Sequence, residues 1–105
     1  MYAVLRRIKV QPHFIEESVQ RMEHGLVLLL RSEPGFVELY VVQVGESERV
    51  SISIFQTRQD AEEGNNKSLE WAKEQIFPLA PGPAEILGVG EILLHWTRVS
   101  EGEKG

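Results

Sequence analysis

The sequence contains no cysteine among its 105 residues. This absence excludes disulfide bonds, thiolate nucleophiles, zinc ribbons and iron–sulfur ligation, and it leaves no sign of an oxidising compartment. No stretch approaches the ~20 apolar residues that span a bilayer. The start MYAVLRRIKV also lacks the basic segment, apolar run and cleavage site of a signal peptide. We therefore expect a cytoplasmic protein with no membrane partner.

Clustered basic charge is scarce as well. The formal net charge is −5, and the nearest approach to a basic cluster is formed by Arg6, Arg7 and Lys9. Binding to a phosphate backbone requires clustered lysine and arginine, so nucleic acid is not expected as a partner.

Motifs for metals and phosphates are missing too. The spacing of His13, His24 and His95 does not resemble a metal site, so no metal is expected. Gly88 and Gly90 lie inside an expected strand with no helix after it, which is not the pattern of a phosphate-binding loop. The sequence therefore gives no indication of a cofactor.

The residues that are present are ordinary for one folded domain. Hydrophobic residues make up 42% of the chain and charged residues 26%, which is far from the composition of disordered chains. The length fits one domain, and there is no internal repeat. We expect a single domain over residues 1–99 and a flexible tail over residues 100–105.

Hydrophobic periodicity predicts six elements. Steps of two indicate strands, steps of three and four indicate helices, and Pro34 with Gly35 ends the first helix. Thr57, followed three residues later by Asp60, has the spacing of a helix N-cap. The expected elements are a strand over Tyr2–Val10, a helix from Ile15 to about Ser32, strands over Phe36–Val44 and Arg49–Gln56, a helix over Arg58–Phe77 and a strand over Ala84–Thr97.

This order of elements is that of the ferredoxin-like fold. In this α+β class, two helices cover one face of a four-stranded antiparallel sheet. The expected inward stripes are Ile15, Val19, Met22, Leu26 and Leu29 on the first helix and Ala61, Asn65, Leu69, Ala72 and Ile76 on the second.

Three of the four strands are apolar on both sides. Side chains alternate along a strand, and an antiparallel sheet with one face in water would alternate apolar with polar residues. Two helices cover only one face, and large exposed apolar patches are rare on monomers. We therefore expect a homodimer in which a second copy covers the other face. In the second strand, the side chains expected on one side are Phe36, Tyr40, Val42 and Val44, and those on the other are Val37, Leu39 and Val41.

Two polar side chains, Asn65 and Ser68, fall on or beside the inward stripe of the second helix. An unpaired buried amide costs about 1–3 kcal/mol. Asn65 therefore either bonds to backbone or water as a core residue, or lines a pocket where it donates to a ligand. Gly64 beside it costs about 1 kcal/mol relative to alanine in a helix, which indicates close packing or space for a guest molecule.

Trp71 and Arg6 have a structural and a functional interpretation each. Trp71 lies at the flank of the same stripe, where an indole packs its ring and keeps its N–H near a polar edge. Arg6 interrupts an apolar strand face, and a buried guanidinium needs a carboxylate or an anionic ligand. An ion pair with Glu38 or Glu91 across the subunit boundary is the structural interpretation of Arg6.

These segments together resemble the antibiotic biosynthesis monooxygenase-like family. The resemblance rests on the strand YAVLRRIKV, the turn EPGF, the strand SISIF leading into a helix with Ala61, Asn65 and Trp71, and the PGP before the last strand. It covers roughly residues 2–96. It implies a dimeric α+β barrel, in which two sheets pack together with the helices outside.

The family contains branches with different activities. In the haem-degrading branch the first strand carries an asparagine and a histidine follows the tryptophan shortly; here that strand carries arginines, and no histidine follows Trp71 before His95. Haem degradation is therefore not expected. In the branch that oxidises polycyclic phenols with dioxygen and no cofactor, an asparagine and a nearby tryptophan bind and polarise the substrate oxygen. Asn65 or Asn66 with Trp71 would correspond to that pair.

The resemblance thus implies cofactor-independent oxygenation of a small aromatic or quinol-type substrate. A strong base is missing from the inward stripes of both helices, so a base would have to come from the sheet, where Tyr2, Tyr40 and His95 are the candidates. The alternative is a non-catalytic homodimer that binds a small hydrophobic molecule or serves as an accessory module. The expected catalytic residues are Asn65, Trp71 and Arg6, and the expected substrate-binding residues are Tyr2, Ser68, Tyr40 and His95.

Overall fold

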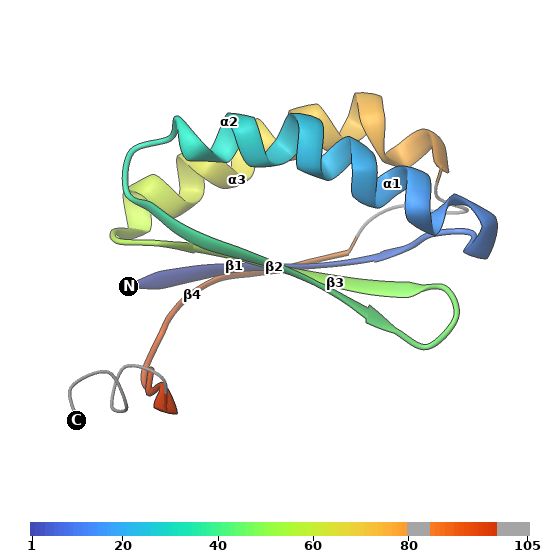
Figure 1. Cartoon of the computed structure of the whole chain (residues 1–105). Coiled ribbons are helices and arrows are strands. Elements are labelled where there is room, and N and C mark those ends of the chain that lie inside the picture. The colour runs from blue at the N-terminus through green and yellow to red at the C-terminus, as the bar shows by residue number, and fades with distance from the viewer. Residues whose placement is uncertain (80–84, 99–105) are drawn as a thin grey trace.

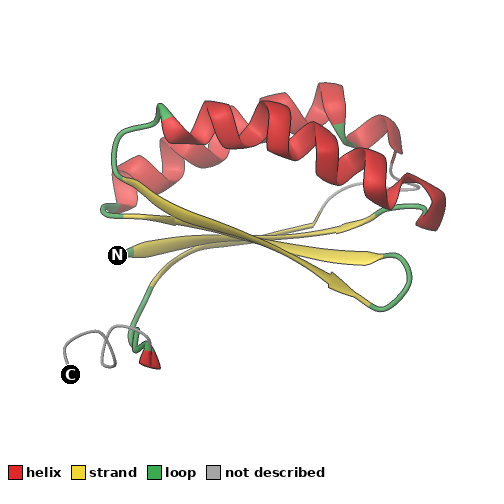
Figure 2. Ribbon diagram, in the orientation of Figure 1, coloured by secondary structure: helices red, strands yellow, loops and turns green. Residues whose placement is uncertain are grey.

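The protein is a four-stranded antiparallel sheet with a layer of helices on one face (Figures 1 and 2). The computed structural model describes residues 1–79 and 85–98. Its elements are β1 (Tyr2–Lys9), a 3-10 turn η1 (Pro12–Phe14), α1 (Ile15–Arg21), a π-helical turn η2 (Met22–Leu26), α2 (Val27–Arg31), β2 (Phe36–Val44), β3 (Glu48–Phe55), α3 (Arg58–Gln75), a second 3-10 turn η3 (Phe77–Leu79) and β4 (Glu85–Glu91).

The sheet has the strand order β2-β3-β1-β4, and every neighbouring pair is antiparallel. α1, η2 and α2 follow one another as a continuous helical rod, which lies beside α3 over the same face of the sheet (Figure 2). The predicted ferredoxin-like α+β fold is confirmed. Within the described ranges, no helix is long and apolar enough to cross a membrane.

Two local signals in the sequence act as predicted. The side chain of Thr57 accepts a hydrogen bond from the backbone N–H of Asp60 at 3.1 Å, which caps the start of α3. Gly35 adopts a φ of +72° in the turn between α2 and β2, where a Cβ atom would also lie 2.2 Å from a carboxylate oxygen of Asp60. Only glycine fits that turn without strain.

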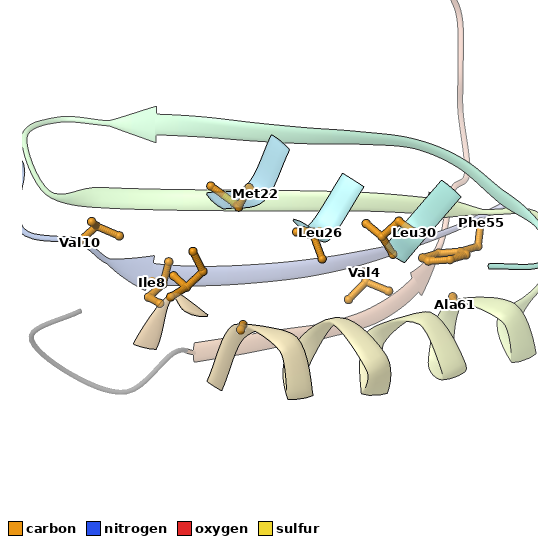
Figure 3. Packing of buried hydrophobic residues seen from close by; sticks show 10 residues of the cluster. Val4, Ile8, Val10, Met22, Leu26, Leu30, Phe55 and Ala61 are labelled. Atoms are coloured by element: carbon orange, nitrogen blue, oxygen red, sulfur yellow. The ribbon is translucent and has the colours of Figure 1, made fainter. Parts of the chain in front are cut away.

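The hydrophobic core fills the space between the sheet and the helices (Figure 3). On the first helical rod the buried positions are spaced by four residues, and the predicted stripe is wrong by one residue at two places. Ser18 is buried while Val19 is exposed, and Leu30 is more deeply buried than Leu29. The π-helical turn has more residues per turn than an α-helix, which keeps a spacing of four on one face. The buried cluster consists of Val4, Ile8, Val10, Met22, Leu26, Leu30, Phe55, Ala61, Ala72 and Ile76.

Gly64 marks the closest approach of α3 to the sheet. A Cβ atom at this position would lie 2.3 Å from the ring of Phe55, which is fully buried. Of the two interpretations of Gly64, close packing is confirmed and space for a guest molecule is wrong.

The last strand is shorter than predicted. β4 ends at Glu91, and the backbone N–H of Ile92 donates to the carbonyl of Met1 at 2.9 Å as the pairing ends. β1 starts at Tyr2, so β4 has no neighbouring strand to pair with beyond this point. The prediction of a strand up to Thr97 is therefore wrong, and residues 92–97 form an extension without regular structure. The predicted start at Ala84 and the predicted tail over 100–105 lie outside the described residues.

The face of the sheet away from the helices, which we call the open face, has an apolar area on β2 and β3 and carries charged side chains beside it, Arg7 and Glu38 among them. Tyr40, Val42 and Val44 of β2 are about half exposed there. Phe36 was predicted on the same side but packs against Phe55 under the helices, with ring centroids 5.6 Å apart. An irregularity in the β2–β3 pairing between Phe36 and Glu38 shifts the alternation by one residue. The prediction that both sides of β2 are apolar still holds.

The strand β3 has its polar side under the helices. The pairing register puts Arg49, Ser51 and Ser53 on the helix-covered face, and it puts Val50, Ile52 and Ile54 on the open face. A polar surface is thereby formed inside the protein, between the sheet and the helical layer.

We predict that Gly64→Ala lowers the free energy of unfolding by about 1–2 kcal/mol, because the clash with Phe55 outweighs the gain of about 1 kcal/mol in helix propensity. Denaturant unfolding followed by circular dichroism measures the change. Glu63→Ala, at an exposed position of the same helix, is the control and should stay within ~0.5 kcal/mol of the unsubstituted protein. A Gly64→Ala protein more stable than the original would contradict the packing described here.

Candidate functional site

Two arginines lie inside the protein, between the sheet and the helices. Arg6 on β1 is 9% exposed and Arg49 on β3 is 3% exposed. Arg6 pairs with Ser51 and Ile8 pairs with Arg49, so the two arginines are diagonal neighbours on the helix-covered face of adjacent strands. The antiparallel register of β1 and β3 thus brings two guanidinium groups together.

Asn65 on α3 holds the guanidinium of Arg6. Nη2 of Arg6 donates to the side-chain oxygen of Asn65 at 2.5 Å and lies 3.5 Å from the backbone carbonyl oxygen of the same residue. Nε of Arg6 is buried and has no hydrogen-bond partner among the residues that the structure describes. The side-chain oxygen of Asn65 is therefore occupied by a cation, and one N–H of Arg6 is left free.

Ser18 on α1 holds the guanidinium of Arg49. Nη1 of Arg49 donates to the Ser18 hydroxyl at 2.7 Å, and that hydroxyl donates to the carbonyl of Ile15 at 2.8 Å. Nε of Arg49 is also buried, and no described residue bonds to it. Both arginines are thus fixed at one end by a neutral group from the helical layer, with a free N–H at Nε.

No carboxylate neutralises either arginine in the part of the chain that the structure describes. The ion pairs found there involve Arg7, Arg21, Arg58 and Lys67, which lie nearer the surface. Burial away from water lowers the pKa of both Arg6 and Arg49 from the ordinary arginine value. Taking a charge out of water costs several kcal/mol unless it is paired, so this arrangement opposes the stability of the fold.

Both guanidinium groups line one small cavity. Its volume is about 40 Å³, which is space for a few water-sized groups. Apart from the two arginines and Ser51, its walls are mostly apolar, so nothing but the arginines provides charge. The remaining lining residues are Ile8, Met22, Leu26, Trp71, Ala72, Ile76 and Phe77.

Trp71 separates this cavity from a larger groove. The groove has a volume of about 430 Å³ and is lined by α3 and by Leu29, and Trp71 borders both spaces. A Cβ atom at Gly25 would lie 2.7 Å from the indole, so the ring rests directly on the π-helical turn η2. A larger residue than glycine at position 25 would push Trp71 out of this wall.

No protein-family model matches the sequence, and no curated protein matches it. Solved structures do match its fold. The ActVA-Orf6 monooxygenase of Streptomyces coelicolor, in complex with nanaomycin D, has a TM-score of 0.68 and 17% identity over 90% of this chain and 92% of that chain. SnoaB, a cofactor-independent oxygenase from Streptomyces nogalater, has a TM-score of 0.67 and 14% identity over 90% of this chain and 94% of that chain.

A protein of unknown function from Nitrosomonas europaea is similar as well, with a TM-score of 0.72 and 16% identity over 91% of this chain and 92% of that chain. A further matching structure carries the name antibiotic biosynthesis monooxygenase. The chain has the antibiotic biosynthesis monooxygenase fold. At these sequence identities the similarity to the solved structures concerns the fold.

Within this monooxygenase fold, the three residues expected to be catalytic lie together. Asn65 contacts Arg6, and Arg6 and Trp71 line the same cavity. The expected ion pair of Arg6 with Glu38 or Glu91 is wrong for a simple reason. Arg6 is buried under α3, whereas Glu38 lies on the opposite face of the sheet and Glu91 is exposed at the end of β4.

The four residues expected to bind substrate are not gathered at the cavity. The hydroxyl of Ser68 donates to the backbone carbonyl of Gly64 at 2.6 Å. Tyr2 packs under the Arg58 guanidinium, whose Cζ lies 5.4 Å from the ring centroid. Tyr40 and His95 are exposed, the first on the open face and the second in the extension after β4.

Tyr40 is also poorly suited to act as a base. Its hydroxyl donates to Glu38 at 2.9 Å, and that hydrogen bond, together with the negative charge of Glu38, raises the pKa of Tyr40 above the ordinary tyrosine value. Within the described ranges no group of three or more histidine, aspartate or glutamate side chains is placed to hold a metal ion.

Arg49 and Ser18 were not anticipated from the sequence. The only signal for Arg49 in the sequence is its place in the alternation Arg49, Ser51, Ser53, which puts the three side chains on one face of the strand. This signal is easily misread, because the polar side of a strand is usually assigned to water. Ser18 gives no comparable signal, since a serine on an amphipathic helix is common.

We predict that Arg49→Met raises the free energy of unfolding by about 1–2 kcal/mol, because an unpaired buried charge is replaced by an apolar chain of similar length. The Ser18 hydroxyl keeps its bond to the Ile15 carbonyl in this variant. Denaturant unfolding at neutral pH measures the change, with Arg7→Met, an exposed arginine on the opposite face, as the matched control. A loss of stability in Arg49→Met would mean that its charge is already compensated.

Proposed function

We propose that this protein is a cofactor-independent monooxygenase that acts on a small aromatic or quinol-type substrate. The observation that carries the proposal is the partly buried contact of Arg6 with Asn65 beside Trp71, at a cavity whose described lining residues include two arginines and no carboxylate. The substrate oxygen would enter the cavity and its ring would pack against Trp71. Two proteins with this fold, a monooxygenase in complex with nanaomycin D and a cofactor-independent oxygenase, support this choice.

The chemistry that such a site can promote starts with a phenol. Positive charge in a low-dielectric cavity favours the deprotonated form, so a phenol bound beside Arg6 and Arg49 has a lowered pKa. This compensates for the absence of a histidine or carboxylate among the cavity residues. The electron-rich phenolate then reduces dioxygen without help from a cofactor.

The overall reaction balances without an external reductant. In its keto form such a phenol has a ring methylene, and this methylene and one dioxygen molecule give a ring carbonyl and one water. The carbon supplies four electrons; one oxygen atom enters the new carbonyl group and the other leaves as water together with the two methylene protons. The guanidinium of Arg6, oriented by Asn65, would stabilise the oxyanion that develops during this step.

A second candidate function is non-catalytic binding of a small molecule in the same place. The small size of the cavity favours it, since about 40 Å³ accommodates an oxygen-bearing group but not a whole polycyclic ring. Both functions use the same residues to contact the ligand. Only the monooxygenase function converts the ligand into a product.

We further propose that the protein is a homodimer whose subunits pack their open faces together. Leu93, Leu94 and Trp96 in the extension after β4 are 89%, 85% and 69% exposed. Figure 1 shows this extension leaving the sheet on the side away from the helices. The extension continues the apolar open face, and a second copy supplies a matching apolar face with its own extension, so each copy can cover the other.

We predict that the purified protein oxidises dihydroxyanthracene-type or quinol substrates under oxygen and that Asn65→Ala reduces kcat by about 10²–10³-fold, because Arg6 loses the group that orients it. Absorbance of the quinone product measures the rate. Glu63→Ala, on the exposed side of α3, should retain full activity. No turnover above background in the unsubstituted protein would favour the binding function.

We predict a solution mass of twice the 11.9 kDa of one chain, and we expect Val42→Glu to shift the mass to that of the monomer. The side chain of Val42 is half exposed in a single chain, so a charge there leaves the fold intact but cannot be buried between two sheets. Light scattering at micromolar concentration measures the mass. A monomeric unsubstituted protein would end the dimer proposal.

A further inference from the structure

The cavity between β1, β3 and α3 combines two features that the fold alone does not require. Two arginines line it from adjacent strands, and each has a buried Nε–H without a partner among residues 1–79 and 85–98. Buried polar groups in proteins are nearly always paired. Two like charges in one apolar cavity also repel each other, so an oppositely charged group is needed there.

Arg7, the residue after Arg6, differs from Arg6 in having carboxylate partners. Arg7 follows Arg6 in the chain but points to the opposite face, where its Nε lies 3.0 Å from Glu48 and its Nη1 lies 3.7 Å from Glu85. Arg7 thus has two carboxylates at the surface, while Arg6 has none in the described part of the chain. Arg49 follows Glu48 in the sequence but, among the same described residues, is bonded to the Ser18 hydroxyl and to no carboxylate.

We infer that the cavity is an oxyanion-binding site, and that its ligand is an organic anion whose carboxylate or phenolate oxygens lie between Arg6 and Arg49. The planar guanidinium presents its N–H groups in a fixed fork that matches such oxygens. The volume of about 40 Å³ fits the charged group of the ligand. The apolar remainder of the ligand contacts Trp71, which forms the wall towards the larger groove.

Recognition at this site is local. The chain as a whole carries a net charge of −5, so long-range attraction does not bring anions to it. Selectivity comes from the two guanidinium groups and from the apolar walls, which cannot solvate a second charge. This favours an organic anion with one acidic group over strongly hydrated anions such as phosphate.

This inference deepens the proposed function by naming the charge of the ligand, and it rests on that function for the place where the ligand binds. It does not rest on catalysis. Binding of anions without turnover would support the oxyanion site and contradict the oxygenase function. Turnover of quinols without any preference for anions would support the oxygenase function and contradict the oxyanion site.

The test is isothermal titration calorimetry of the full chain at constant ionic strength with benzoate and 4-nitrophenolate, each compared with a neutral analogue, benzamide and 4-nitroanisole. We expect each anion to bind about 10- to 100-fold more tightly than its neutral analogue, which is the range for a charge-assisted hydrogen bond. The two arms separate a carboxylate ligand from a phenolate ligand. Inorganic phosphate is expected to bind more weakly than either anion.

Arg6→Gln and Arg49→Met should each weaken binding of the preferred anion by about 10- to 100-fold. Arg7→Gln, the adjacent arginine on the other face, should leave it unchanged. Thermal unfolding gives a second readout: the preferred anion should raise the Tm of the unsubstituted protein and of Arg7→Gln but not that of Arg49→Met. The inference would be overturned if anions and neutral analogues bound with equal affinity. It would also be overturned if Arg7→Gln lost as much affinity for the anion as Arg6→Gln and Arg49→Met.

Discussion

The alternation of side chains along β3 is the constraint on which the site and the outer surface both depend. A strand offers every second residue to one face. β3 gives Arg49 and Ser51 to the helical layer and Val50 and Ile52 to the open face. A polar cavity inside and an apolar face outside are therefore two results of one register. The usual arrangement, with apolar residues inside and polar residues in water, is reversed over residues 49–54 of this strand, whereas Phe55 at its end is buried in the core.

The helical layer completes the cavity by close contacts at two glycines. Gly64 lets α3 approach Phe55, and Gly25 lets the indole of Trp71 rest on the π-helical turn η2. α3 in turn brings Asn65 to Arg6, and α1 brings Ser18 to Arg49. Each guanidinium is thus oriented by a neutral group, and neither is neutralised. A site kept at the expense of stability is what a binding function requires, because a carboxylate built into the protein would compete with the ligand.

The fold was largely predictable because its signals are local. The Thr57 cap and the Pro34–Gly35 stop depend on a few neighbouring residues. The cap starts α3 where expected, and the stop ends the first helical rod where expected. The errors arose where a distant strand decides the outcome. β4 ends at Glu91 because β1 has no residues left to pair with, and Phe36 changes face because of an irregularity in its pairing with β3. Periodicity within one segment contains no information on either.

The sequence by itself determined the composition of the site in part: an arginine inside an apolar strand, and an asparagine and a tryptophan on one helix. It also determined that both sides of β2 are apolar, since that follows from alternation alone. Only the tertiary structure decided that Arg6 lies next to Arg49, that Asn65 contacts a cation rather than backbone, and that no carboxylate of the described residues pairs with either arginine. The physical reason is that charge compensation in a protein interior depends on which side chains meet across strands and helices. That meeting is fixed by pairing register and helix packing, not by the spacing of residues in the chain.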